Sequence, residues 1–115
     1  MQQSDWRRIS TLARTKNNIL YHRTPTEILV QWSKMKFSVT ANTLNTILQE
    51  FFSDGAEKML GASETNPPKG GFGWYLHDRF PQYTPRHASA IAAIMCDLEL
   101  LEHRGKCPVY LKRKQ

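Results

Sequence analysis

The sequence predicts a mainly α-helical fold with a small β-hairpin (α+β), and three observations support this expectation. An apolar stripe recurs at helical spacing between residues 40 and 53. Two threonine–proline pairs, at positions 24–25 and 84–85, have the composition of helix starts. Two short apolar runs flank a glycine-containing turn within residues 100–112, which is typical of a hairpin. A chain of 115 residues allows a single compact domain with one appended arm.

Residues 1–37 are expected to form a basic arm of two helices. Ser4 or Asp5 can cap the first helix, which would run to about residue 20. Thr24 can cap the second, and Pro25 and Glu27 complete its start signal, so we expect a helix over about 25–36. The apolar run that follows Glu27 could instead begin a strand.

Residues 38–115 are expected to form the main domain. A helix over about 40–53 carries an apolar stripe made of Leu44, Ile47, Leu48, Phe51 and Phe52. A further helical turn could follow near residues 56–60, and the glycines and prolines of 61–71 predict a flexible loop. A helix of about eight residues then ends at Pro81, another begins at Pro85, and the hairpin follows at 100–112.

Composition limits the classes of function. The chain has 16 Lys and Arg against 10 Asp and Glu, a net charge of +6, which favours an anionic partner. No apolar stretch is long enough for a membrane span, and no apolar segment follows the N-terminal arginines as in a secretory signal. Two cysteines form no disulfide framework, so we expect a reducing cytoplasm.

The positive charge is concentrated towards both ends of the chain. Residues 1–37 have a net charge of +5, residues 38–66 of −3, and residues 67–115 of +4. After Glu102 the chain has no acidic residue. An ordinary soluble surface with basic ends is the alternative explanation, because charge asymmetry in a single domain is a weak signal.

The passage IAAIMCDLELLEHRGKCPVYLKRK resembles the end of a winged helix-turn-helix domain. In such regulators a recognition helix ends in a leucine, acid, leucine, basic, glycine passage that leads into the wing. The resemblance covers about residues 39–113, and it departs from the usual plan at 61–71, where a short first strand would be expected. It implies that the helix from Pro85 lies in the major groove and that Arg104 and Lys106 press against the adjacent DNA backbone or minor groove.

We therefore expect a non-enzymatic nucleic-acid-binding protein, with double-stranded DNA as the partner. A regulator of transcription or replication, of bacterial, archaeal or mobile-element type, fits this pattern, as a homodimer or in a larger nucleoprotein assembly. In the helix that begins at Pro85, the face opposite the apolar stripe has few hydrogen-bonding groups. It could therefore distinguish one base sequence from another only weakly. The candidate nucleic-acid-binding residues are Lys69, Thr84, Arg86, His87, Ser89, Ala90, Arg104, Lys106, Lys112, Arg113 and Lys114.

The alternative is a protein-interaction module that docks on a partner, as a subunit or an inhibitor. Small residues such as Ala93 could accept another protein's helix. Trp74 lies outside the apolar stripe of its helix and beside the glycine loop, where an exposed tryptophan would suggest an interface hot spot. Trp6 is the third candidate interface residue.

Catalysis, metal binding and cofactors are not expected. Cys96, His103 and Cys107 follow the spacing Cys-x6-His-x3-Cys, which lacks the paired ligands of a structural zinc site. His77 and Asp78 are adjacent but no nucleophile motif or phosphate-binding loop accompanies them.

Overall fold

The described residues among the first forty form an antiparallel sheet and not the helical arm predicted for 1–37. A computed structural model describes residues 6–13, 18–106 and 108–114 of the chain. In this part, four consecutive strands pair in the order β1-β2-β3-β4. They are β1 (Arg7–Ile9), β2 (Ile19–Arg23), β3 (Glu27–Trp32) and β4 (Met35–Thr40). The expectation of a mainly α-helical fold with extra N-terminal helices was therefore wrong. The described residues form seven strands beside three helices, so the chain is an α+β fold in which strands are as prominent as helices. The parts of the predicted first helix at 1–5 and 14–17 lie outside the described residues.

An alternating burial pattern explains why residues 27–32 form a strand. Ile28, Val30 and Trp32 are buried, while the residues between them point to the other face of the sheet. Ile28 and Trp32 are four positions apart, a spacing that fits a helix as well as a strand. Val30 fits only the period of two, and β-branched residues favour a pleated surface.

The threonine–proline signal at 24–25 closes a turn in place of a helix start. The backbone N–H of Glu27 donates to Thr24 Oγ1 at 3.1 Å, which is the hydrogen bond that a helix cap would make. The N–H of Thr24 also donates to the carbonyl of Glu27 at 2.8 Å, so the chain reverses between β2 and β3. Threonine and proline suit tight turns for the same reasons that they suit helix starts.

The three helices and the C-terminal hairpin follow one another in the predicted order. The helices are α1 (Ala41–Glu50), α2 (Phe72–Arg79) and α3 (His87–Asp97), and the hairpin consists of β6 (Leu101–Arg104) and β7 (Tyr110–Arg113). Thr40 caps α1, with Oγ1 accepting from the N–H of Thr43 at 3.0 Å. The helical turn expected near 56–60 is instead β5 (Lys58–Met59), which pairs with β7, so the second sheet has the order β5-β7-β6.

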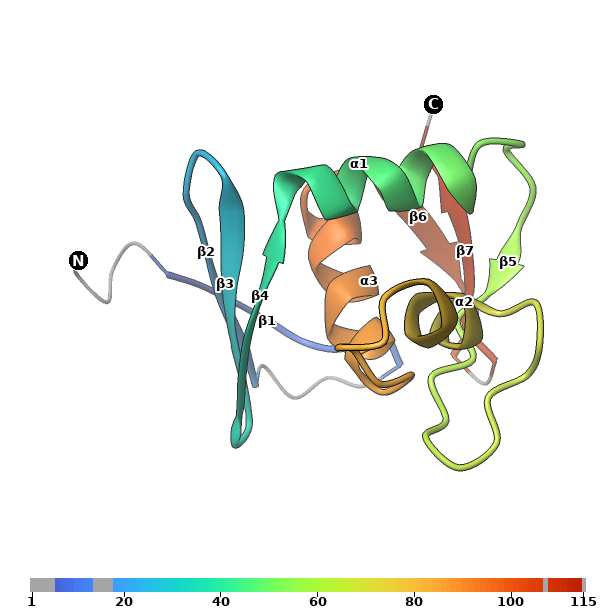
Figure 1. Cartoon of the computed structure of the whole chain (residues 1–115), viewed down its shortest axis with the longest axis horizontal. Helices are drawn as coiled ribbons and strands as arrows, with labels where there is room; N and C mark the ends of the chain where they lie inside the picture. Colours follow the sequence, from blue (N-terminus) through green and yellow to red (C-terminus); the bar gives the residue numbers. More distant parts are fainter. Residues whose placement is uncertain (1–5, 14–17, 107, 115) are drawn as a thin grey trace.

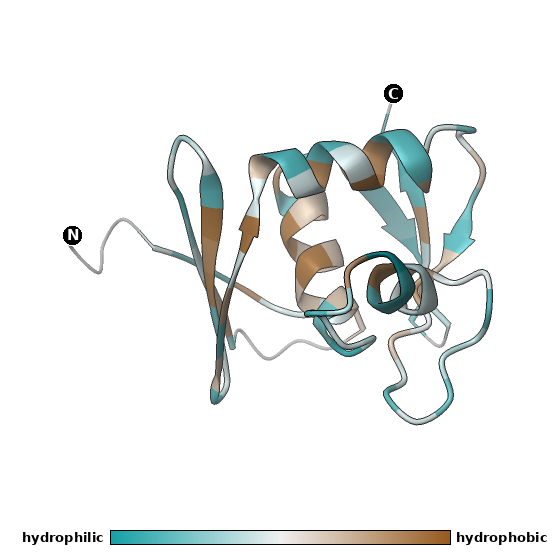
Figure 2. Cartoon of the chain, in the orientation of Figure 1, coloured by the Kyte–Doolittle hydropathy of each residue, from teal (hydrophilic) through white to brown (hydrophobic). Residues whose placement is uncertain are grey.

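Helix α3 runs through the middle of the molecule (Figure 1). The four-stranded sheet lies on one side of it and the three-stranded sheet on the other, while α1 crosses one end. Seven of its eleven residues are buried, and no Lys, Arg, Asp or Glu lies between Arg86 and Asp97. Hydrophobic residues are therefore found on most of α3 and on the faces turned towards it (Figure 2). A helix that is apolar all round is expected to be buried.

Polar contacts join α3 and its neighbours to the four-stranded sheet. Asp97, at the end of α3, accepts a hydrogen bond from the Tyr21 hydroxyl at 2.5 Å and is paired with Arg7. The hydroxyl of Tyr83, between α2 and α3, donates to the carbonyl of Ser38 at 2.6 Å. One continuous cluster of buried side chains includes residues from both sheets and all three helices. None of the described helices is both long and apolar enough to cross a membrane.

Candidate functional site

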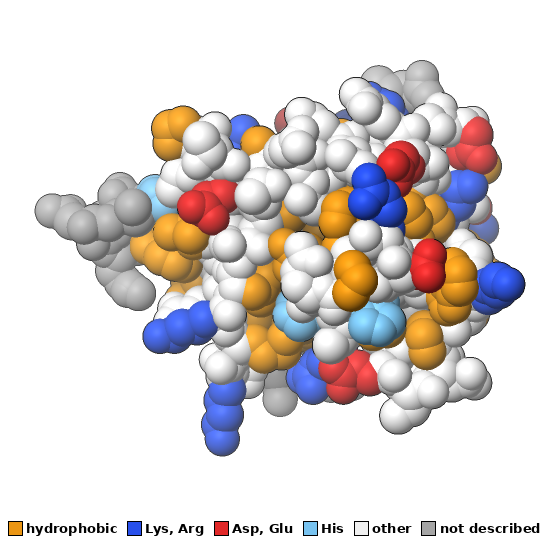
Figure 3. Space-filling model, viewed as in Figure 1, with side chains coloured by type: hydrophobic (Ala, Val, Ile, Leu, Met, Phe, Trp, Pro, Cys, Tyr) orange, Lys and Arg blue, Asp and Glu red, His pale blue; other side chains and the backbone are white. Residues whose placement is uncertain are grey.

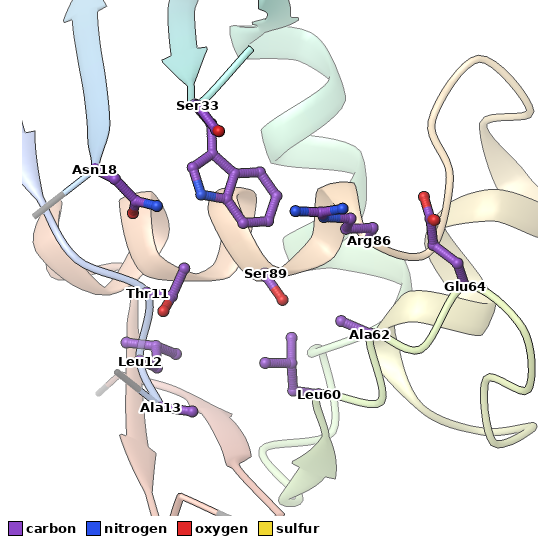
Figure 4. Close-up of a pocket in the computed structure, with 11 residues that line it drawn as sticks. Thr11, Leu12, Ala13, Asn18, Ser33, Leu60, Ala62, Glu64, Arg86 and Ser89 are labelled. Atoms are coloured by element: carbon purple, nitrogen blue, oxygen red, sulfur yellow. The ribbon is translucent and has the colours of Figure 1, made fainter. Parts of the chain in front are cut away.

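An open cavity of about 550 Å³ lies at the start of α3, and we call it the Arg86 cavity (Figure 4). Four parts of the chain line it: the described residues between β1 and β2, the turn between β3 and β4, the segment that follows β5, and the N-terminal end of α3. Its polar lining consists of Thr11, Asn18, Ser33, Glu64, Arg86 and Ser89, and its apolar lining of Leu12, Ala13, Trp32, Leu60 and Ala62. Two of the predicted nucleic-acid-binding residues, Arg86 and Ser89, are thus brought together.

The Arg86 guanidinium is held in place by an aromatic ring. Its central carbon lies 5.2 Å from the centre of the Trp32 ring, and Trp32 itself is only 6% exposed. Figure 4 shows the Arg86 side chain extending towards this ring and away from Glu64. No described carboxylate is close enough to form an ion pair with Arg86. The cavity therefore presents a positioned cation with hydroxyl and amide groups beside it, which suits a phosphate or another anion on the side of Arg86 that faces away from Glu64.

Thr84 and His87 belong to a hydrogen-bond network behind the cavity. The N–H of Thr84 donates to His87 Nδ1 at 3.0 Å, so this ring nitrogen is an acceptor. Thr84 Oγ1 lies within hydrogen-bond distance of both His87 Nδ1 and Glu64 Oε1. Burial lowers the pKa of His87, which keeps the ring neutral. These two residues position the start of α3 and do not add positive charge to it.

The backbone at the start of α3 offers few open donors. The N–H groups of His87, Ala88 and Ser89 donate to the carbonyls three residues before them. A phosphate placed here would be bound by side chains, mainly Arg86 and Ser89, and less by the helix terminus. The N–H groups of Gly71 and Gly73, at the start of α2, are no more available, because both already donate to backbone carbonyls.

Ala90 and Ala93 are not on the surface. They are 0% and 3% exposed, because the helix face that carries them packs into the core. Neither side chain can touch a thymine methyl group or another protein's helix in this fold. The small residues of α3 instead let the neighbouring elements approach it closely.

The β6–β7 hairpin carries five of the predicted contact residues, but it does not bring them together. Arg104 is paired with Glu57 at 2.5 Å, and its guanidinium lies 4.6 Å from the centre of the Tyr110 ring. Lys106 is exposed in the turn between the strands. Lys112 and Arg113 pair with the first residues of β6, at the opposite end of the hairpin from Lys106. Lys114 forms an ion pair with Glu99.

The remaining candidates lie on separate surfaces. Lys69 Nζ is 5.6 Å from the centre of the half-buried Trp74 ring, beside α2. Trp6 is half-buried on the outer face of the four-stranded sheet, where it stacks on His22 with ring centres 5.8 Å apart. The predicted contact residues are therefore distributed over several faces, and the Arg86 cavity groups only two of them.

Sequence reasoning missed several residues of the cavity. Trp32 and Ser33 were assigned to a helix, so their proximity to Arg86 was not foreseen. Glu64 falls in the predicted flexible loop, and the structure places it at the cavity, in contact with Thr84. The apolar, partly β-branched run Ile28-Leu29-Val30 was the local signal for a strand that could have placed Trp32 on its inner face.

No metal site emerges from the described residues, in which no three His, Cys, Asp or Glu side chains gather. Cys96 is half-buried, and burial raises the pKa of its thiol to about 12. Cys107 lies outside the described residues.

No protein-family model, curated protein or solved structure matches the chain. The chemistry of the cavity and of the charged surfaces is therefore the basis for a functional proposal.

Proposed function

We propose that this protein binds nucleic acid without catalysing a reaction, with duplex DNA as the partner. The observation that carries the proposal is Arg86, an exposed cation that is positioned by Trp32 and forms no ion pair with a described residue. Arginine held by an aromatic face is well suited to phosphate.

The distribution of charge supports an anionic partner. Five ion pairs occur among the described residues, and each takes one cation and one carboxylate. They therefore leave the surplus of six positive charges in the sequence uncompensated. The face over α1 and α2 mixes both signs, so it is the less suitable side for a phosphate backbone (Figure 3).

Three turns with exposed cations lie in the lower half of the view in Figure 1, spread along the long axis of the molecule. They are the β3–β4 turn with Lys34, the start of α3 with Arg86, and the β6–β7 turn with Lys106. None of the three cations takes part in an ion pair with a described residue. We call this surface the basic end, and it is where we place the phosphates.

The burial of α3 changes the mechanism that the winged-helix resemblance implies. A helix with seven of eleven residues buried cannot enter the major groove along its length. Arg86 and Ser89, at its first turn, are the residues of α3 that remain accessible from the cavity. Contacts would go to the phosphate backbone, so binding would depend strongly on salt and weakly on base sequence.

Salt dependence of binding to a mixed-sequence duplex tests the proposal. Three phosphate contacts predict a slope of about −2.7 for log affinity against log salt, or about a 40-fold loss between 50 and 200 mM. Replacing Arg86 and Lys106 together with alanine should reduce the slope to about −0.9. Fluorescence anisotropy with a labelled duplex measures both values.

A matched control changes the net charge equally at another surface. Arg79 and Lys58 are already paired with Glu50 and Asp54, so the double variant R79A/K58A should keep the slope of the wild type. No binding at low salt, or equal slopes for the two double variants, would contradict the proposal.

Trp74 favours a protein partner as the second candidate function. This half-buried ring, with Lys69 beside it, borders a small hollow of about 100 Å³ together with Pro67 and Pro85. Tryptophan beside a pocket is typical of an interface hot spot. A Trp74→Ala variant that binds duplex DNA normally, but loses a protein partner retained by the wild type in a pull-down, would favour this function.

A further inference from the structure

The outer face of the four-stranded sheet is formed by two rows of side chains that cross the strands. The first row is Arg8, Leu20, Gln31 and Lys36, as the register of the four strands places them opposite one another. The second row is His22, Leu29 and Ser38, and Trp6 extends it by stacking on His22. Successive side chains of a strand point to opposite faces, so the residues between them point into the core.

No described element covers this face. The inner face packs towards α3 and contains the buried residues Ile19, Ile28, Val30 and Val39, while the helices all lie on that side (Figure 1). On the outer face, Trp6, Leu29, Gln31, Lys36 and Ser38 border a shallow hollow of about 560 Å³. Figure 3 shows the sheet towards its left side, with a histidine, hydrophobic side chains, Lys or Arg side chains and an acidic side chain on it.

The chemistry of the face combines stacking groups with cations. Trp6 and His22 form a stacked pair with planes 30° apart, and both are only partly buried. Arg8 and Lys36 are exposed on the two outer strands, and neither row contains an acidic residue. Among the described residues of the four strands, the acid on this face is Glu27, which lies beyond the second row, opposite Thr40. An anionic ligand with flat rings is complementary to such a surface.

We propose that this face binds single-stranded DNA, with unpaired bases stacked on Trp6 and His22 and phosphates near Arg8 and Lys36. Stacking on aromatic side chains within a positive groove is how proteins bind single strands without sequence preference. Four strands span about 14 Å between their outer members, which exceeds the roughly 12 Å width of the major groove. The face is therefore too wide to enter the major groove, and in a duplex the ring faces that would stack on Trp6 and His22 are covered by neighbouring bases. This face is opposite the sheet face that carries Trp32, on which Arg86 lies, and the inference goes beyond the proposed duplex binding.

Anisotropy with a labelled oligonucleotide of twelve thymidines tests the inference. Trp6→Ala should weaken binding by about 5- to 150-fold, the range for the loss of one stacked base. Trp6→Phe should retain most of the affinity because it keeps an aromatic ring. Lys36→Ala should lower the salt slope by about 0.7. Since Lys36 is exposed, this variant reports on binding even if replacing Trp6 disturbs the sheet.

The controls separate this site from the basic end. Trp74→Ala removes a tryptophan from another face and should leave thymidine binding unchanged. Arg86→Ala should weaken duplex binding and leave the single strand unaffected, so the two proposals can fail independently. Equal affinity of the wild type and Trp6→Ala, absence of binding at low salt, or a Trp6-dependent dimer in sedimentation would overturn the inference.

Discussion

Replacing Tyr21 with phenylalanine tests how the four-stranded sheet is attached to α3. Tyr21 is 4% exposed, and its hydroxyl donates to Asp97 at the end of α3. Hydrogen bonds to charged groups contribute about 1.5–3 kcal/mol. Asp97 keeps Arg7, and its side chain is 19% exposed, so water can replace the lost donor. We therefore expect the free energy of unfolding to fall by about 1.5 kcal/mol in urea titrations at pH 7.

The same variant has a pH dependence whose sign follows from Asp97. Arg7, with a contribution from Tyr21, holds the pKa of Asp97 below its usual value of 3.8. Stability from a lowered carboxyl pKa is present above the unfolded value and is lost as pH falls through the folded value. The cost of Tyr21→Phe should therefore shrink at pH 3.

Tyr110→Phe is the matched control, because the Tyr110 hydroxyl has no hydrogen bond to a described residue, and it should be nearly neutral. A Tyr21→Phe cost below about 0.5 kcal/mol, or one as small as that of Tyr110→Phe, would refute the reasoning.

Two further predictions concern packing and reactivity. A Cβ at Gly73 would lie 2.2 Å from the carbonyl oxygen of Gly61, so Gly73→Ala should cost about 3 kcal/mol in urea titrations. Gly71→Ala, with its nearest contact at 3.2 Å, should cost less, and equal costs would contradict this explanation. Because burial raises the pKa of Cys96 to about 12, its alkylation at pH 8 should be slow and should accelerate in urea. Peptide mass spectrometry measures the rate of alkylation at Cys96. Rapid modification of Cys96 in the folded protein would contradict its burial.

The helices were predictable because each has local signals that tertiary structure does not override. The apolar stripe of α1 at helical spacing is buried as predicted, at Leu44, Ile47 and Leu48. Pro81 comes two residues after the last residue of α2, Arg79, and cannot continue the helix. Gly105 lies in the turn between β6 and β7. The N-terminal sheet was not predictable in this way, because Thr24 and Glu27 make the same hydrogen bond in a turn as in a helix cap.

The candidate site was only partly predictable because it depends on the missed sheet. Arg86 was found from its place at a helix start, but Trp32, which positions it, comes from β3. Ala90 and Ala93 were assigned to the surface because a helix against a single core would expose one face. The sheet supplies a second core surface, and the absence of Lys, Arg, Asp and Glu between Arg86 and Asp97 was the sequence signal for it.

A two-dimensional NMR titration of the isotope-labelled protein with a mixed-sequence DNA duplex tests the central claim most directly. We expect the largest amide shifts at the basic end, around Lys34, Arg86 and Lys106, and their disappearance as salt is raised. The interior of α3, from Ala90 to Met95, should be little affected. Absence of shifts at low salt, or shifts centred on α1 and α2, would contradict the proposal that the basic end binds nucleic acid.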